Sequence, residues 1–178
     1  MTDLKILKHP HPLLRKKAVA IPAITPEICR IGNAMLQKVL DLEAWGLAGN
    51  QIGFCHRIIV VNLFTELPDD PEFRAIMVNP EITWYSGIID AHEEGCLSVP
   101  FMQGGPISRD DHVKVTYLDL DGNQQEHEAR GNLAHCFQHE IDHLDGKLYF
   151  DHLSLIKRAQ FLKLYDKAQR EDRKTDHA

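Results

Sequence analysis

The segment His139-Glu140-Ile141-Asp142-His143 constrains the fold of this 178-residue chain more than any other feature. It has the pattern H-E-x-x-H, and on an α-helix residues four positions apart lie on the same face. His139 and His143 can therefore direct their imidazoles toward one metal ion, and Glu140 can reach a metal-bound water as a general base. A catalytic zinc-type site takes three protein ligands and one open position, so the fold must bring a third ligand to this helix.

The pattern of apolar residues predicts an α+β fold with antiparallel sheets around the H-E-x-x-H helix, together with an N-terminal and a C-terminal helix. Helical spacing predicts helices at residues 25–43, at 132–144 and from 154 onward. Alternating or β-branched residues predict strands at 57–63, 75–78, 113–120 and 124–129. We expect a hairpin turn at Asp121-Gly122 and a strand end at Asn79-Pro80.

Length and composition narrow the class of protein. We expect one catalytic domain over residues 1–170, followed by a charged and frayed tail at 171–178. The net charge of -6 argues against direct nucleic-acid binding. No apolar run approaches the roughly 20 residues of a membrane span. Because the N-terminus also lacks the apolar core of a secretory signal, we expect a cytoplasmic protein with reduced cysteines.

Three segments carry a resemblance to a known family. They read GLAGNQIG at residues 46–53, EEGCLSVP at 93–100 and QHEIDHLDG at 138–146. In order and spacing they resemble the signature motifs of the peptide deformylases, written G-φ-A-A-x-Q-φ-G, E-G-C-φ-S and Q-H-E-x-D-H-φ-x-G. The resemblance begins in residues 4–15 and extends to the final helix, so it covers nearly the whole chain.

The resemblance implies that Cys96 is the third ligand, beside His139 and His143. These ligands would hold one divalent metal, with an open position for water. The family typically uses Fe²⁺ for activity, and the same donors bind Zn²⁺ or Ni²⁺. The sequence leaves the choice among these metals open.

The implied reaction removes the N-formyl group from the N-terminal formyl-methionine of nascent polypeptides. Glu140 would accept a proton from the metal-bound water and pass it to the leaving amine, while the Gln51 amide and the Leu97 N–H stabilise the oxyanion. Gly46 and Gly95 match positions where the substrate backbone approaches closely, since glycine has no Cβ. Nascent N-formylated polypeptides are thus the expected partners, with the ribosome as a candidate place of contact; we expect a monomer that binds no membrane.

Several residues around the expected substrate pocket depart from the family pattern. His92, Asn132 and His135 are polar where the family usually has aliphatic residues, and Trp45 replaces a smaller residue. Asn132 and His135 share the helix face of His139, so we expect them to line the pocket. Two interpretations stay open: variation without effect on formyl-methionine, or a changed preference for the first side chain.

Two further departures concern the backbone. Asn50 stands where a proline is common, which is expected to loosen one backbone angle. Residues 101–106 are interpreted as a loop, and they lack an arginine often found there.

Two other function classes compete with a deformylase. In a metalloprotease of the H-E-x-x-H group, the third histidine of the metzincin pattern would stand where this chain has Tyr149. In a non-catalytic relative that only binds peptides, the catalytic residues need not be retained. The intact set of Gln51, Cys96 and Glu140 argues against that second alternative.

Overall fold

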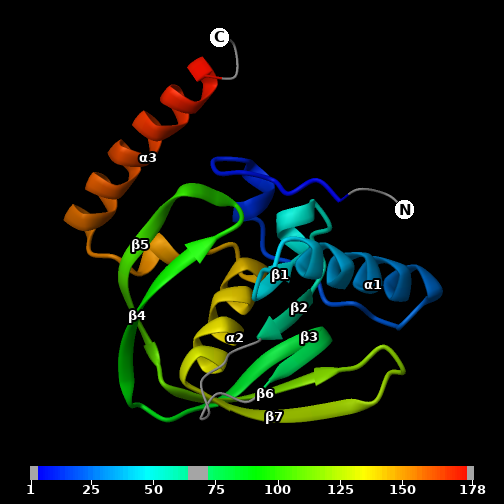
Figure 1. Ribbon diagram of the computed structural model, residues 1–178. Coiled ribbons are helices and arrows are strands. Elements are labelled where there is room, and N and C mark those ends of the chain that lie inside the picture. The colour runs from blue at the N-terminus through cyan, green and yellow to red at the C-terminus, as the bar shows by residue number, and fades with distance from the viewer. Residues whose placement is uncertain (1–3, 64–71, 176–178) are drawn as a thin grey trace.

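The H-E-x-x-H segment lies on helix α2 (Gly131–Leu144), at the centre of an α+β fold (Figure 1). The computed structural model describes residues 4–63 and 72–175. The other helical elements are η1 (Pro12–Arg15), α1 (Pro26–Asp41), η2 (Gly49–Ile52), η3 (Tyr149–His152) and α3 (Leu155–Thr175). The strands are β1 (Gly46–Ala48), β2 (Ile58–Leu63), β3 (Phe73–Tyr85), β4 (Ile89–Cys96), β5 (Val99–Asp110), β6 (His112–Leu118) and β7 (Gln124–Arg130). The predicted fold class is confirmed.

Two antiparallel sheets lie on either side of α2. One has five strands in the order β1-β2-β3-β6-β7, and the other is a two-stranded ribbon of β4 and β5. In Figure 1, α2 lies between this β4–β5 ribbon and the five-stranded sheet, whereas α1 covers the other face of that sheet. Helix α3 projects away from the body of the molecule beside the ribbon. Among the described residues, no helix has both the length and the apolar character to cross a membrane.

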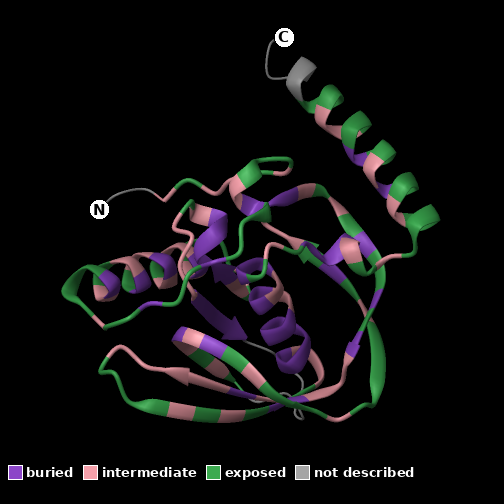
Figure 2. Cartoon of the chain, turned by 180° about the vertical axis from the view of Figure 1, so that it is seen from behind, coloured by how far each residue is buried: buried purple, intermediate pink, exposed green. Residues whose placement is uncertain are grey.

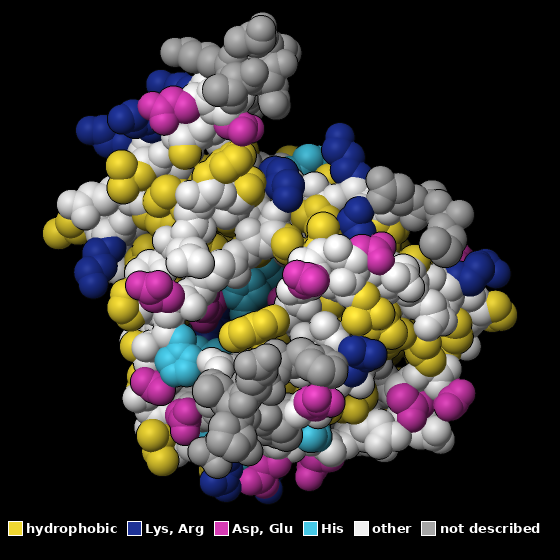
Figure 3. All heavy atoms as spheres, viewed as in Figure 1, with side chains coloured by type: hydrophobic (Ala, Val, Ile, Leu, Met, Phe, Trp, Pro, Cys, Tyr) yellow, Lys and Arg dark blue, Asp and Glu magenta, His cyan; other side chains and the backbone are white. Residues whose placement is uncertain are grey.

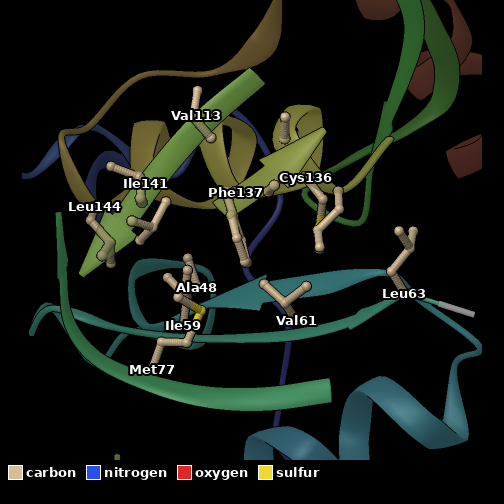
Figure 4. Packing of buried hydrophobic residues seen from close by; sticks show 14 of the residues in the cluster. Ala48, Ile59, Val61, Leu63, Met77, Val113, Cys136, Phe137, Ile141 and Leu144 are labelled. Atoms are coloured by element: carbon tan, nitrogen blue, oxygen red, sulfur yellow. The ribbon is translucent and has the colours of Figure 1, made fainter. Parts of the chain in front are cut away.

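Strand β2 is buried on both faces, which explains its continuous apolar sequence. Ile59 and Val61 belong to the hydrophobic cluster that packs under α2 (Figure 4). Ile58 and Val60 point the other way, into the cluster formed with α1. Successive side chains of a strand alternate between the two faces of the sheet, so one short run supplies both cores.

Helix α2 has one apolar face and one polar face. Leu133, Phe137, Ile141 and Leu144 are buried in the cluster shared with the sheet, and Figure 4 shows the last three pointing toward β2. Burying a side chain of this size stabilises the fold by roughly 1.5–3 kcal/mol. Figure 2 shows α2 almost entirely buried, so its polar face is held inside the protein as well.

Local signals placed several elements correctly. Helix α1 begins after Thr25, whose hydroxyl accepts a hydrogen bond from the Ile28 N–H at 3.3 Å, with Pro26 as the first helical residue. Strands β6 and β7 form the predicted hairpin, and Gly122 at its turn has a φ of 82°. A positive φ is the conformation for which a turn selects glycine.

The predicted strand end at Asn79-Pro80 is wrong, because β3 continues to Tyr85. The register between β3 and β6 shifts between Val78 and Glu81, and Asn79 has a φ of 50°. The Asn79 side chain donates to the Ile21 carbonyl and accepts from the Ile21 N–H, both at 2.8 Å. The Asn-Pro pair therefore forms a bulge within a strand that passes through it.

The predicted loop at residues 101–106 is also wrong, because these residues belong to β5. The strand β4 that pairs with them was not predicted either. The register shifts where Glu93 pairs with Pro106 and Glu94 with Gly104, so the Gly-Pro segment forms an irregularity within the ribbon. A Cβ at Gly104 would collide with the Tyr149 ring, which explains why a glycine stands in this strand.

The charged C-terminal segment is helical further than expected. Helix α3 continues to Thr175, so residues 171–175 have helical backbone. The rest of that predicted tail, residues 176–178, lies outside the described residues. Most of α3 is exposed in Figure 2, and its contact with the body comes mainly from buried Phe161 and Tyr165.

Gly146 gives a test of how tightly α2 is held at its C-terminal end. Its φ is 75°, and an added Cβ would lie 2.5 Å from the Arg15 carbonyl oxygen. We expect Gly146→Ala to lower the free energy of unfolding by about 2–4 kcal/mol, from backbone strain together with the clash. Gly87→Ala is the matched control, since Gly87 has the same φ of 75° with nothing within 4 Å of its Cβ position. Equal losses of stability in urea titrations would contradict the clash.

Candidate active site

Three potential metal ligands come together between α2 and the β4–β5 ribbon. Cys96 ends β4, and His139 and His143 lie one turn apart on α2. One donor atom from each of the three residues lies within 4.8 Å of the others. The Cys96 Sγ is 3.2 Å from the His143 Nε2. The distant E-G-C and H-E-x-x-H segments therefore form one site, as the sequence predicts.

The chemistry of these donors fits a divalent metal. A tetrahedral ion with bonds of about 2.0–2.3 Å places its ligand atoms roughly 3.5 Å apart. Burial opposes ionisation of Cys96, but the charges and hydrogen bonds of His143 and His139 lower the pKa of its thiol well below the usual value. The Ser98 N–H is also directed at the sulfur, at 3.4 Å. A thiolate beside two imidazoles is the donor set that zinc-type and ferrous sites use.

Glu94 orients His139, one of the candidate ligands. Its Oε2 lies 2.7 Å from the His139 Nδ1, so this nitrogen carries the proton and the Nε2 lone pair stays available for a metal. Burial alone would raise the pKa of Glu94, but hydrogen bonds from His139 and Arg109 outweigh burial and lower the pKa to about 2. Glu94 is therefore an anion inside the protein.

Arg109 neutralises this anion and a second one. Its guanidinium binds both oxygens of Glu94 and donates to the Asp142 Oδ2 at 2.8 Å. Asp142 also accepts from the His152 Nε2 at 2.7 Å, and these contacts keep its pKa low despite burial. Asp142 is therefore not a solvated surface carboxylate of the helix, since it connects α2 to β5 and η3.

Sequence reasoning missed Glu94 and Arg109. Glu94 belongs to the E-G-C motif, so the motif marked it as a site residue. Nothing in the sequence indicated that its carboxylate contacts His139. Arg109 had no local signal at all. Its role follows only from the pairing of β4 with β5, which was not predicted.

The metal site opens into a cavity of about 520 Å³. Figure 3 shows it as a hollow with histidine side chains inside and acidic side chains at its edge. All the predicted site residues line it except the buried His143, namely Trp45, Gly46, Gln51, His92, Gly95, Cys96, Leu97, Asn132, His135, His139 and Glu140. The fold thus brings the predicted ligands, the predicted acid–base residue and the predicted pocket residues to a single cavity.

Glu140, the predicted acid–base residue, is buried at the cavity. It is 4% exposed, and its Oε2 has no hydrogen-bond partner among the described residues. Burial raises the pKa of this carboxyl, against the opposing effect of His139 and His143. A raised carboxyl pKa brings proton transfer closer to neutral pH. A Cβ at Gly46 would lie 2.5 Å from the Glu140 Oε1, so Gly46 also makes room for this side chain.

The side chain of Gln51 is held in one orientation. Its Oε1 accepts from the Ala48 N–H at 2.7 Å. Its Nε2 donates to the Ser98 Oγ at 3.2 Å and lies 3.6 Å from the Cys96 Sγ. The donor end of the amide therefore faces the metal ligands, which is the orientation that an oxyanion donor needs.

Asn50 contributes a contact that the sequence did not predict. It is fully buried, and its Nδ2 donates to the Lys16 carbonyl at 2.6 Å and to the His143 carbonyl at 2.8 Å. The expected loosening of the backbone is therefore offset by a side chain that ties the first motif to the end of α2.

The N-terminal segment connects the first two motifs with the last helix. The Leu7 N–H donates to the Gln51 carbonyl at 2.7 Å, and the His9 N–H donates to the Ser98 carbonyl at 2.8 Å. On α3, the Tyr165 hydroxyl and the Gln169 amide both donate to the His9 carbonyl. The segment around His9 thus joins the second motif to the middle of α3.

Comparison with known proteins agrees with this geometry. The family model described as polypeptide deformylase matches residues 3–159. A peptide deformylase of Agrobacterium fabrum is 38% identical over 170 residues, which cover 96% of this chain and 98% of that protein. The crystal structure of peptide deformylase from Ehrlichia chaffeensis has a TM-score of 0.88 and 32% identity, covering 96% of this chain and 99% of the other.

A third similar structure contains a peptide. It is the Met-Ala-Ser-bound peptide deformylase from Acinetobacter baumannii, with a TM-score of 0.78 and 34% identity. The match covers 84% of this chain and 98% of that one.

Arg109 offers a test of the buried charge network. Arg109→Met would leave Glu94 and Asp142 buried without their shared cation, so we expect a loss of about 3–5 kcal/mol in the free energy of unfolding. Metal affinity should also fall roughly 10–100-fold, because His139 loses its anchored partner. Arg57→Met is the control: Arg57 pairs at 2.8 Å with the more exposed Asp145, and such a pair contributes about 0–1 kcal/mol. Similar losses in the two variants would show that the network has no special role.

Proposed function

The chain belongs to the polypeptide deformylase family, and from that premise we propose that it removes the N-formyl group from the N-terminal methionine of nascent polypeptides. The observation that carries the proposal is the grouping of Cys96, His139 and His143 beside buried Glu140 on one cavity. The relative from Acinetobacter baumannii, which is bound to Met-Ala-Ser, supports a substrate that begins with methionine.

We assign the metal site to Cys96, His139 and His143, with one divalent ion per chain. A bound ion of this kind polarises a carbonyl and lowers the pKa of water. Iron(II) is our assignment for the active enzyme, since family resemblance favours it; the donor set also suits zinc and nickel.

The remaining steps fall to residues of the chain. Glu140 accepts the proton that the attacking water loses, and then passes it to the amine that leaves. The Gln51 amide and the Leu97 N–H stabilise the negative charge that develops on the formyl oxygen. Support comes from the buried position of Glu140 and from the fixed orientation of Gln51. Gly95 has open space on its Cβ side, which leaves room for a substrate backbone.

We also propose a cellular compartment, an oligomeric state and a place of contact with the substrate. The four cysteines are unpaired, and a Cys96 thiolate needs a reducing compartment, which supports the cytoplasm. A monomer remains our proposal for the oligomeric state. The ribosome is the place where the substrate appears, and the net charge of -6 argues against other nucleic-acid contacts.

The metalloprotease alternative has no support in the geometry. Tyr149 is 1% exposed, and its hydroxyl donates to the Met102 carbonyl at 3.3 Å. The third donor beside the two histidines is the Cys96 sulfur. The retained Glu140 and Gln51 favour an enzyme over a relative that only binds peptides.

Cys96→Ala tests the ligand assignment. We expect purified wild-type protein to contain close to one metal per chain and this variant to lose most of it, because two imidazoles alone hold the ion weakly. Elemental analysis by mass spectrometry measures the content and identifies the metal. Cys55→Ala is the control, since Cys55 is half-buried and lies outside the cavity. A full metal complement in Cys96→Ala would overturn the assignment.

Glu140→Gln tests the proton transfer. With formyl-Met-Ala under anaerobic conditions and Fe²⁺, we expect formate release to fall about 10²–10⁴-fold while the metal is retained. Glu126→Gln, an exposed carboxylate on β7, should match the wild type. Undiminished turnover in fully metallated Glu140→Gln would rule out this role for Glu140. An inactive wild type would count against the proposed function as a whole.

A further inference from the structure

One wall of the cavity is built from two stacked histidines. The rings of His92 and His135 lie 4.0 Å apart at an interplanar angle of 13°. Both ring nitrogens of His92 have neighbours at hydrogen-bond distance: its Nδ1 is 3.1 Å from the Asn132 Oδ1 and its Nε2 is 2.9 Å from the Asp90 Oδ2. His92 therefore anchors the stack, whereas His135 lacks hydrogen-bond partners among the described residues.

His135 is a buried polar group without partners. It is 5% exposed, and neither ring nitrogen has a hydrogen-bond partner among the described residues. Burial, followed by the charge of His92, lowers the pKa of His135, which favours the neutral imidazole. A neutral imidazole always presents one N–H donor and one acceptor. Buried polar groups are nearly always paired, so this exception points to a partner that comes from the cavity.

The position of His135 fits the first side chain of a substrate. It lies one helical turn before His139, about 6 Å along the helix axis, and lines the same cavity. A substrate side chain of methionine's length that starts beside His139 and runs along α2 toward His135 would span this distance. The neighbouring Cys136 does not compete for such a partner, since its thiol is directed at the Trp45 carbonyl at 3.5 Å.

We propose that the cavity selects a first side chain of about methionine's length that ends in a hydrogen-bond-accepting oxygen, and that the N–H of His135 donates to this oxygen. The inference rests on the deformylase activity of the proposed function and revises its first residue, from methionine to a side chain that ends in an accepting oxygen. Oxidised methionine fits this chemistry, because a sulfoxide keeps the length of methionine and adds a polar oxygen. The carboxamide of glutamine carries an accepting oxygen at the same distance along the chain.

An ordinary thioether meets these requirements poorly. The sulfur of methionine is a weak acceptor, so its binding would leave the His135 N–H buried and unpaired. Sites with a buried hydrogen-bonding group reject the substrate analogue that lacks the matching group. One buried group left unpaired corresponds to a preference of about tenfold or more for the substrate that pairs with it.

The first experiment uses the wild-type enzyme and a panel of formyl-X-Ala peptides. X is methionine, methionine sulfoxide, glutamine or norleucine, and kcat/KM is measured by formate release. We expect the sulfoxide peptide to exceed methionine and norleucine by about tenfold or more. The glutamine peptide separates the two sources of the oxygen: a preference for both polar peptides indicates any accepting oxygen, and a preference for the sulfoxide alone narrows the class to oxidised methionine. Methionine or norleucine as the best substrate would overturn the proposal while leaving the deformylase function intact.

A second measurement does not depend on turnover. Dissociation constants of the same peptides are determined by calorimetry on Glu140→Gln, and the order of affinities should follow the order of kcat/KM. If no peptide is hydrolysed by the wild type, the proposed function fails, and the binding order still decides the inference about the cavity. Equal affinities for the methionine and sulfoxide peptides would contradict it.

The variant His135→Leu then tests the residue itself. We expect the preference for the sulfoxide over methionine to fall by about tenfold or more, because the donor is removed and the wall becomes apolar. His127→Leu is the matched control: His127 is half-buried, packs against Phe73 and lies outside the cavity. An unchanged ratio in folded His135→Leu would show that His135 does not set the preference. If that variant does not fold, the wild-type panel and the binding series carry the decision.

Discussion

The buried guanidinium of Arg109 is the interaction on which the site depends. It faces two carboxylates, Glu94 on the β4–β5 ribbon and Asp142 on α2. Each carboxylate alone would be costly inside the protein, and together with one cation they leave the group with a single net negative charge. His139 and His152 donate to the same carboxylates and complete the network. One arginine thus fixes the distance between the element that carries Cys96 and the helix that carries both histidines.

This arrangement divides α2 into two faces with different tasks. The apolar face packs the helix against the five-stranded sheet, and the polar face presents the two candidate histidine ligands, Glu140 and part of the cavity wall to the ribbon. Because the helix is buried on nearly all sides, the polar groups on it need partners, and most of them have one. Gln138, for example, exchanges hydrogen bonds with the backbone of Asp110 on β5. Three residues of α2 are exceptions among the described residues: Glu140 and His143 each have one polar atom without a partner, and His135 has no partner on either ring nitrogen.

The sequence predicted those parts of the fold that depend on local signals. Thr25 and Pro26 mark the start of α1, the apolar run at 58–63 marks a strand buried on both faces, and Asp121-Gly122 marks a hairpin. The β4–β5 ribbon lacks such signals, since its strands contain charged residues, glycine and proline, and their conformation depends on pairing with each other. The same reason explains what was missed in the site. The candidate ligands could be predicted from short motifs. The role of Arg109 and the hydrogen bond from Asn50 to the His143 carbonyl could not, because both depend on tertiary contacts.

The contacts around His9 have a consequence for the order in which the protein acquires its structure. The His9 N–H donates to the carbonyl of Ser98, two residues after Cys96. The His9 carbonyl accepts hydrogen bonds from Tyr165 and Gln169 on α3. During synthesis the segment around His9 leaves the ribosome well before α3 does. This segment therefore makes all its contacts only after α3 docks. Contacts between such distant segments form slowly because loop closure must precede them, so assembly of the cavity belongs to the end of folding.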